Sequence, residues 1–218
     1  MKRILAVFAH PDDETFGPGG TLLTWAKKGY EIHLLCVTHG ENGMNNTKHH
    51  TAHVRERELK KAAKILGIAR VEFLDFIDGT IGNHDIPRLR EKITAKIRTF
   101  QPHRILTFDL TGVSGHLDHV AVANAVTSAF DKTGIADELY YWTLSREDSE
   151  LVKDYFIHFP AGRELAEIDK TVDVSPVWEE RLQAMWCHES QKKDIEEILT
   201  EWHQRGTKKE YFLIRKRK

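Results

Sequence analysis

The chain has 218 residues, of which 40% are hydrophobic and 30% charged, a composition that suits one globular α/β domain with a sizeable core. Its net charge is −1 and its basic residues are not gathered in one arm, so we expect no nucleic-acid partner. No stretch approaches the ~18 apolar residues of a membrane span, and the first residues lead into a strand pattern rather than a signal peptide, so we expect a cytoplasmic protein with no membrane span.

Strand and helix patterns alternate along the first two thirds of the chain. Apolar runs predict strands over residues 4–9, 31–38, 71–74, 104–108 and 139–143. Helical spacing, with glycine or proline at several ends, predicts helices over residues 20–28, 51–66, 87–100 and 116–130. This alternation predicts a Rossmann-like, doubly wound, mostly parallel sheet with helices on both faces.

The last third of the chain has a less regular pattern. A helix is expected over residues 145–153 and an irregular stretch through Pro160. Pro176 opens a long helical region that is expected to break near Glu189, and a final strand is expected over residues 210–214. Because no repeat, low-complexity segment or linker interrupts the chain, we expect a single domain over residues 1–218.

The first motif, Ala-His-Pro-Asp-Asp-Glu at residues 9–14, follows directly after the first predicted strand. In open α/β sheets, ligands bind at the carboxyl ends of strands near the point where the strand order reverses. His10, Asp12 and Asp13 offer nitrogen and oxygen ligands that suit zinc. One aspartate can bind the metal while the other takes a proton from an attacking water, although the residues alone do not decide which. The alternative is a polar turn whose aspartates cap the next helix.

The second motif, Gly-His-Leu-Asp-His at residues 115–119, follows the fourth predicted strand. His116 and His119 are three residues apart at a helix start, so they can share one face. One can be a third metal ligand and the other can stand at the reaction centre. Three protein ligands leave a position for water, as in catalytic zinc sites. Asp118 either orients a neighbouring ligand or merely stabilises the helix dipole.

Together the two motifs resemble those of the LmbE-like, or PIG-L, family of N-acetylglucosaminyl deacetylases. Residues 9–14 match the family's opening signature, and residues 116–120 resemble its second signature, usually His-Pro-Asp-His-Val. Leu117 stands where that signature has proline, but the spacing of the two histidines is kept. Weaker similarities extend over the loop at residues 38–43, the helix around Arg55 and a C-terminal segment that includes His188.

The resemblance implies a role for each residue of the site. His10, Asp13 and His119 are expected to bind the metal, Asp12 to act as general base, and His116 to stand as a charged histidine beside the developing oxyanion. The metal would polarise the amide carbonyl and activate the attacking water. Zn²⁺ is the expected cofactor, although the same ligand set can hold iron or manganese. A homo-oligomer is also expected, since family members commonly oligomerise.

The resemblance therefore predicts a zinc-dependent hydrolase that removes an N-acetyl group from a GlcNAc-containing small molecule. One alternative is a related zinc amidase that acts on a thiol conjugate or another small amide through the same site. An alternative of a different class is a non-catalytic zinc- or nucleotide-binding module. The Gly-rich fingerprint that nucleotide binding would need is absent from the sequence.

Several further residues are weaker candidates for the site. Arg55 and His188 are substrate-binding candidates, with a surface ion pair and a hydrogen-bonded helix histidine as the respective alternatives. His39, after the second strand, is a candidate for the same crevice. The run Tyr140–Trp142 could supply a ring that stacks on a sugar. The roles of three more histidines are left open between an additional metal site and a polar loop: His49, His50 and His53.

Overall fold

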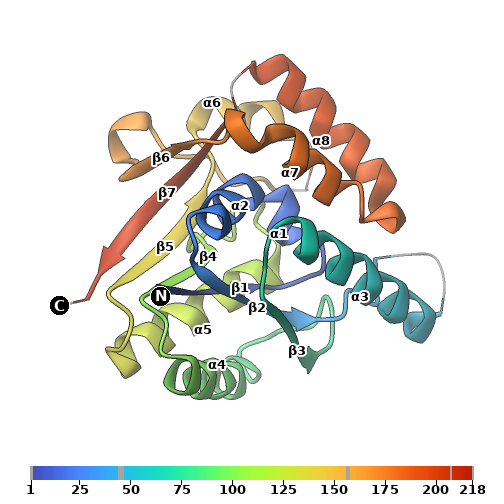
Figure 1. Cartoon of the computed structure of the whole chain (residues 1–218). Helices are drawn as coiled ribbons and strands as arrows, with labels where there is room; N and C mark the ends of the chain where they lie inside the picture. The colour runs from blue at the N-terminus through green and yellow to red at the C-terminus, as the bar shows by residue number, and fades with distance from the viewer. Residues whose placement is uncertain (1, 44–46, 156–157, 207, 218) are drawn as a thin grey trace.

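The computed structural model describes residues 2–43, 47–155, 158–206 and 208–217, and its centre is one seven-stranded sheet between two layers of helices (Figure 1). The sheet has the order β3-β2-β1-β4-β5-β7-β6. The first five strands of this order pair in parallel, whereas β7 is antiparallel to both β5 and β6. The strands are β1 Arg3–Phe8, β2 Glu31–Thr38, β3 Arg70–Phe76, β4 Arg104–Phe108, β5 Glu138–Thr143, β6 Lys170–Asp173 and β7 Lys209–Lys216.

Helices cover both faces of the sheet, which confirms the predicted fold class (Figure 1). On one face α4 (Ile86–Phe100) and α5 (Leu117–Thr133) pack against each other and against β1. On the other face α2 (Gly19–Lys27) and α3 (Lys48–Ile65) both contact α7 (Trp178–Met185). The other α-helices among the described residues are the short α1 (Asp13–Phe16) and α6 (Arg146–Leu151) and the longer α8 (Lys192–Arg205).

The apolar character of β1 follows from its place in the middle of the sheet. Every residue from Ile4 to Phe8 is fully buried, because helices cover both faces of this strand. On its two sides β1 pairs with β2 and β4, so the strand order reverses at β1. The carboxyl ends of β1 and β4 therefore lie side by side, at the place where doubly wound sheets bind ligands.

Local sequence signals explain where several elements begin and end. Helix α3 begins three residues before its predicted start, because the Thr47 side chain accepts a hydrogen bond from the His50 amide and caps the helix. The expected break near Glu189 is confirmed by a 3₁₀ turn, Glu189–Gln191, between α7 and α8. Helix α1 and strand β6 are among the elements that were not predicted. Helix α1 is one turn long, and β6 is short and mostly exposed, so neither carries a hydrophobic period.

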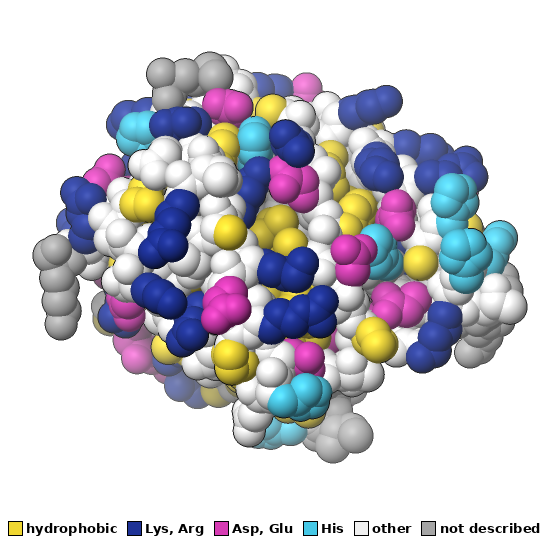
Figure 2. All heavy atoms as spheres, turned by 90° about the horizontal axis from the view of Figure 1, so that it is seen from below, with side chains coloured by type: hydrophobic (Ala, Val, Ile, Leu, Met, Phe, Trp, Pro, Cys, Tyr) yellow, Lys and Arg dark blue, Asp and Glu magenta, His cyan; other side chains and the backbone are white. Residues whose placement is uncertain are grey.

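Two observations concern the membrane span and the nucleic-acid partner that were not expected from the sequence. No helix among the described residues is both long and apolar enough to cross a bilayer. On the face drawn in Figure 2, acidic side chains lie among the basic ones, so the charges of this face are mixed.

Candidate functional site

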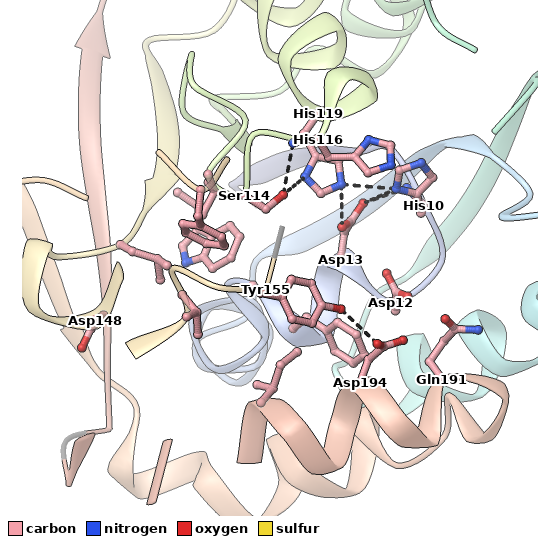
Figure 3. A pocket seen from close by; sticks show the side chains of 18 of the residues that line it. His10, Asp12, Asp13, Ser114, His116, His119, Asp148, Tyr155, Gln191 and Asp194 are labelled. Carbon is pink, nitrogen blue, oxygen red and sulfur yellow. Dashed lines mark hydrogen bonds and ion pairs between the residues drawn. The ribbon is translucent and has the colours of Figure 1, made fainter. Parts of the chain in front are cut away.

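The two sequence motifs meet at the carboxyl ends of β1 and β4. The first motif forms the turn between β1 and α1, and the second leads into α5. Residues of both motifs line one cavity of about 470 Å³ (Figure 3). All five residues of the predicted metal and catalytic set line this cavity: His10, Asp12, Asp13, His116 and His119.

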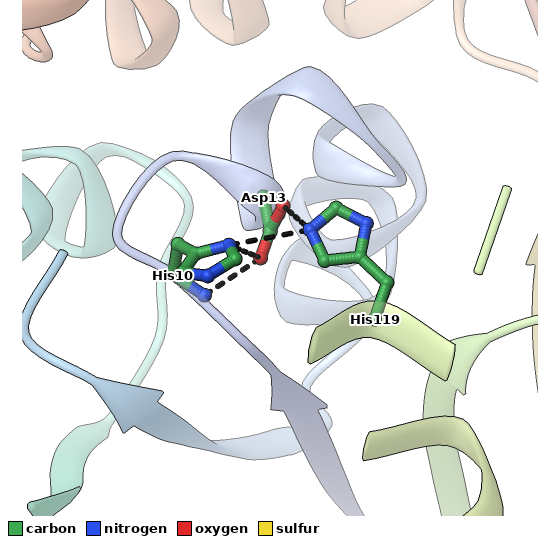
Figure 4. Close-up of side chains that lie close together, drawn as sticks. All are labelled: His10, Asp13 and His119. Atoms are coloured by element: carbon green, nitrogen blue, oxygen red, sulfur yellow. Dashed lines mark hydrogen bonds and ion pairs between the residues drawn. The ribbon is translucent and has the colours of Figure 1, made fainter. Parts of the chain in front are cut away.

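The three predicted metal ligands converge on one point (Figure 4). The Nδ1 atom of His10 lies 3.2 Å from Nε2 of His119 and 3.7 Å from Oδ2 of Asp13. The Nε2 atom of His119 lies 3.3 Å from Oδ1 of Asp13. Ligand atoms bound tetrahedrally at the zinc–nitrogen distance are roughly 3.3 Å apart. The spacing of these donor atoms therefore fits a single zinc-sized ion.

Further contacts hold the two histidine rings in this orientation. The Nε2 atom of His10 lies 3.1 Å from Oδ2 of Asp118 and 3.0 Å from Oδ1 of Asp78. The Nδ1 atom of His119 lies 3.1 Å from the Gly112 carbonyl oxygen and 3.3 Å from Oγ of Ser114. Metal-binding histidines commonly donate their other ring N–H to a carboxylate or a carbonyl in this way.

Asp118 is buried, and its carboxylate serves a loop as well as the His10 ring. It accepts hydrogen bonds from the backbone amides of Gly79 (2.8 Å) and Ile81 (3.1 Å). Its position thus matches the orienting role considered from the sequence. Burial alone would lower the pKa of His10, but hydrogen bonds to Asp118 and Asp78 and the charge of Asp13 raise it to about 10.

Sequence reasoning did not identify Asp78. It lies in the loop between β3 and α4, and an aspartate in a glycine-containing loop carries no signal of its own. In the structure Asp78, His10 and His116 form a second group of candidate ligands, which shares His10 with the first. Asp78 also accepts a hydrogen bond from the Asn42 amide, at 3.1 Å. The two groups together place Asp78 at the edge of the metal site.

Asp12 has an unusual backbone conformation, with φ 130° and ψ −30°. Such angles are rare for a residue other than glycine, and this kind of strain concentrates at functional sites. Its amide donates to Oε2 of Glu14, at 3.1 Å. Burial raises the pKa of Asp12 to about 7, although the charge of Arg55 acts in the opposite direction.

Arg55 holds both the backbone and the side chain of the first motif. It is 3% exposed, and its Nη2 atom donates to Oδ2 of Asp12 and to the Pro11 carbonyl, both at 2.6 Å. Its Nη1 atom donates to the Gly40 carbonyl at 2.9 Å. The alternative of a surface ion pair is therefore wrong. Arg55 lines the cavity, but its charge is committed to Asp12.

His116 differs from what the resemblance implies. Burial, followed by the charges of His119 and His10, lowers the pKa of His116 to about 4. The lowered pKa favours the neutral ring over the charged histidine that the resemblance implies. Its Nδ1 atom accepts a hydrogen bond from the Asp118 amide at 3.1 Å and caps α5. Because Nδ1 is an acceptor, the proton of the neutral ring lies on Nε2.

His188 is not among the described residues that line the cavity, so the contact with substrate that was considered from the sequence has no support in its position. Its side chain is fully buried and lies 2.7 Å from Oε1 of Glu14. The alternative of a hydrogen-bonded histidine fits this placement. Glu14 in turn accepts a hydrogen bond from the Asp12 amide. His188 therefore stabilises the first motif through Glu14.

The other candidate histidines are also not among the described residues that line the cavity. His39 stacks on Phe73 and is paired with Glu56 and Asp75. The three histidines at the start of α3 are exposed, and the groups of candidate metal ligands found among the described residues do not include them: His49, His50 and His53. At the end of β5, Trp142 lines the cavity, whereas Tyr140 and Tyr141 are buried elsewhere.

Comparison with known proteins agrees with these motifs. The family model described as PIG-L, GlcNAc-PI de-N-acetylase, matches residues 5–130. A probable N-acetyl-α-D-glucosaminyl L-malate deacetylase 2 from Bacillus cereus is 32% identical over 197 residues, which cover 87% of this chain and 84% of that protein.

Two solved structures share the fold at low sequence identity. N,N'-diacetylchitobiose deacetylase from Pyrococcus horikoshii has a TM-score of 0.75 at 19% identity, over 99% of this chain and 84% of that one. A 4-carboxy-2-hydroxymuconate hydratase from Pseudomonas putida has a TM-score of 0.75 at 22% identity, over 98% of this chain and 96% of that one. Since the fold is shared with a hydratase, it does not by itself decide the reaction. The family match and the Bacillus relative, however, show that the chain belongs to the PIG-L family of LmbE-like N-acetylglucosaminyl deacetylases.

Proposed function

We propose that this protein is a metal-dependent hydrolase that removes the N-acetyl group from a GlcNAc-containing small molecule. One observation carries the proposal. His10, Asp13 and His119 converge at the spacing of metal ligands, and Asp12 lines the same cavity beside them. The names of the family and of the Bacillus relative support the N-acetylated amino sugar as substrate.

Each residue of the site has a role in the proposed reaction. Held by His10, Asp13 and His119, a zinc ion would supply Lewis-acid activation of the amide carbonyl and of the attacking water. Asp12 accepts the proton of that water, and the hydrogen bond from Arg55 holds the Asp12 carboxylate in place. The Nε2–H group of neutral His116 donates a hydrogen bond to the developing oxyanion. Asp12 then returns its proton to the leaving amine as the C–N bond breaks.

Zinc is the metal that the donor set favours, because two imidazole nitrogens and one carboxylate with an open position are typical of catalytic zinc. Iron or manganese can occupy the same donors, so a metal count identifies the ion. The homo-oligomer, the single domain and the cytoplasmic location expected from the sequence stay predictions. Light scattering of the purified protein tests the first of these.

The alternatives differ in what they require of the site. A related amidase acting on a thiol conjugate would use the same residues, so only a substrate panel separates it from the deacetylase. A non-catalytic metal-binding module would have no need for the strained backbone of Asp12 or for the buried Arg55 that holds its carboxylate. These two features favour an enzyme.

The direct test is release of free amine from a panel of N-acetylglucosaminides by protein of known metal content. Release that a chelator abolishes, with about one ion per chain, is the expected result. No release from any glucosaminide by fully metal-loaded protein would overturn the proposal.

A further inference from the structure

The cavity has two unlike walls. One carries the metal and catalytic residues. The other, here called the apolar wall, comes from the end of α6 and the segment after it, together with α8, which packs against α6. Figure 3 shows Tyr155 and Asp194 of this side turned toward each other, and the Tyr155 hydroxyl donates to Oδ1 of Asp194 at 3.0 Å. The apolar wall consists of Leu151, Val152, Tyr155, Phe159, Ile198 and Trp202.

The side chains of the apolar wall are not buried in the protein core. They are half-buried, and Tyr155 is 41% exposed, so they present apolar surface to the cavity. A cavity of about 470 Å³ lies within the range that holds small organic ligands. Apolar surface of this kind is covered favourably by an alkyl or aromatic group of the ligand.

The cations that line the cavity already have partners. Arg55 is bound to Asp12. Arg181 is 3% exposed, lies 3.4 Å from Oε1 of Glu210 and donates to the Gly17 carbonyl at 2.7 Å. Lys209, at the start of β7, lies opposite Asp173 of β6 in the sheet register; after the hydrogen bonds from Ser175, its charge helps to lower the pKa of Asp173.

Acidic side chains other than those of the metal site also belong to the lining of the cavity. Asp148 and Asp194 belong to its lining, whereas the charge of Glu210 is matched by that of Arg181. An anionic group beside the apolar wall would therefore meet the Asp194 carboxylate, while the two lining arginines are paired with Asp12 and Glu210. Burying a carboxylate without a partner is strongly unfavourable.

We infer that the substrate carries an uncharged, apolar group on the sugar, an aglycone of phenyl or short alkyl type that lies along the apolar wall. This inference rests on the proposed function, which places the acetyl group at the metal. The substrate inferred for this chain differs from the one in the name of the Bacillus relative, because the L-malate group of that substrate is anionic at neutral pH.

A panel of α-glycosides of N-acetylglucosamine tests the inference on metal-loaded protein, with kcat/KM for amine release as the readout. The aglycones are phenyl, 4-carbamoylphenyl, 4-carboxyphenyl and L-malyl. The second and third have nearly the same shape and differ in charge. We expect the phenyl and carbamoylphenyl compounds to exceed the two anionic compounds by at least about tenfold.

A variant of the apolar wall supplies a second test. Ile198→Arg places a cation on α8, and Ile198→Met is the uncharged control of similar length. We expect Ile198→Arg to lower kcat/KM for the phenyl compound by roughly tenfold and to narrow the gap to the carboxyphenyl compound, whereas Ile198→Met keeps the wild-type order. Circular dichroism and metal content check that both variants are folded.

The outcomes separate the inference from the proposed function. If the malyl or carboxyphenyl compound is hydrolysed as well as its neutral counterparts, the inference is wrong and the deacetylase assignment stands. If no glucosaminide is hydrolysed by metal-loaded protein, the proposed function fails and the inference falls with it. Should Ile198→Arg fail to fold, the wild-type panel still decides.

Discussion

The Nε2 atom of His10 lies 3.1 Å from Oδ2 of Asp118, although 108 residues separate the two in the chain. The contact joins the turn after β1 to the first turn of α5, so it links the two sequence motifs directly. With Nε2 directed at a carboxylate, the Nδ1 atom of His10 is left to face Asp13 and His119. Asp118 thus sets which nitrogen of His10 is offered to the metal.

Replacing Asp118 by asparagine tests this positioning role. Asp118→Asn removes the charge that holds the His10 ring and disturbs the amides of Gly79 and Ile81. We expect metal affinity to fall about 10- to 100-fold, measured by competition with a chelator of known affinity. Asp85→Asn is the control, because Asp85 accepts from an amide of the same loop, that of Gly82, without touching His10. Equal affinity in the Asp118→Asn and wild-type proteins would refute the role.

The contacts of Arg55 predict an effect on turnover rather than on substrate binding. Lysine has one charged nitrogen, so Arg55→Lys cannot hold Asp12, Pro11 and Gly40 together. We expect kcat to fall on the order of 10- to 100-fold with little change in KM, because misplaced catalytic groups lose rate. Arg57→Lys, on the exposed side of α3, is the control. A raised KM with unchanged kcat would instead support the direct substrate contact expected from the sequence.

The buried pair of His188 and Glu14 predicts a stability that depends on pH. Burial alone would lower the pKa of His188, but the charge of Glu14 and the hydrogen bond to it outweigh burial and raise the pKa above its ordinary value of 6.5. The stability from the charged pair is therefore present in full below pH ~6.5 and is lost as pH rises through the raised pKa. Removing one partner of a buried pair costs about 3–5 kcal/mol.

His188→Leu should accordingly lower the free energy of unfolding by that amount near pH 6, and by less at a pH above the raised pKa. Urea denaturation at a series of pH values measures this difference. His188→Gln keeps a hydrogen-bond donor without the charge, so its loss should be smaller at every pH and should decrease with rising pH in the same way. A loss for His188→Leu that is the same at every pH would show that the pair is not charged.

Leu117 allows a test of the one departure from the family's second signature. It is the first residue of α5 and is 78% exposed, and His116 before it is extended, with φ −61° and ψ 127°. Proline suits the first helical position, and the residue before it prefers an extended backbone. Leu117→Pro should therefore raise the free energy of unfolding by about 0.4–1 kcal/mol and leave kcat unchanged. A loss of stability would mean that the backbone here does not accept proline.

The sheet and the metal ligands could be predicted from the sequence because their signals are local. Buried parallel strands read as apolar runs, and each motif follows directly after such a strand. The neutral state of His116 could not be predicted, since it depends on burial and on two histidines from different motifs. The roles of Asp78 and Arg55 depend on contacts made between distant segments, at His10 and at Asp12 respectively. The spacing of residues in the sequence does not indicate such contacts.

The apolar wall was also missed, for a related reason. Its residues come from the end of α6, from the irregular segment that follows and from α8. Apolar side chains at helical spacing, as in α8, predict contact with the core. In the structure several of these side chains line the cavity instead. Whether an apolar helix face meets the core or a ligand is decided by how the helix docks, which the sequence pattern leaves open.

The central claim is that Asp12 performs proton transfer at a metal held by other residues. The most direct measurement is the metal content and the deacetylation rate of Asp12→Asn, determined on the same preparation with wild-type protein alongside. The account predicts about one ion per chain in both proteins and a rate at least about 100-fold lower in the variant. A variant that retains its metal and hydrolyses the substrate at the wild-type rate would contradict the account.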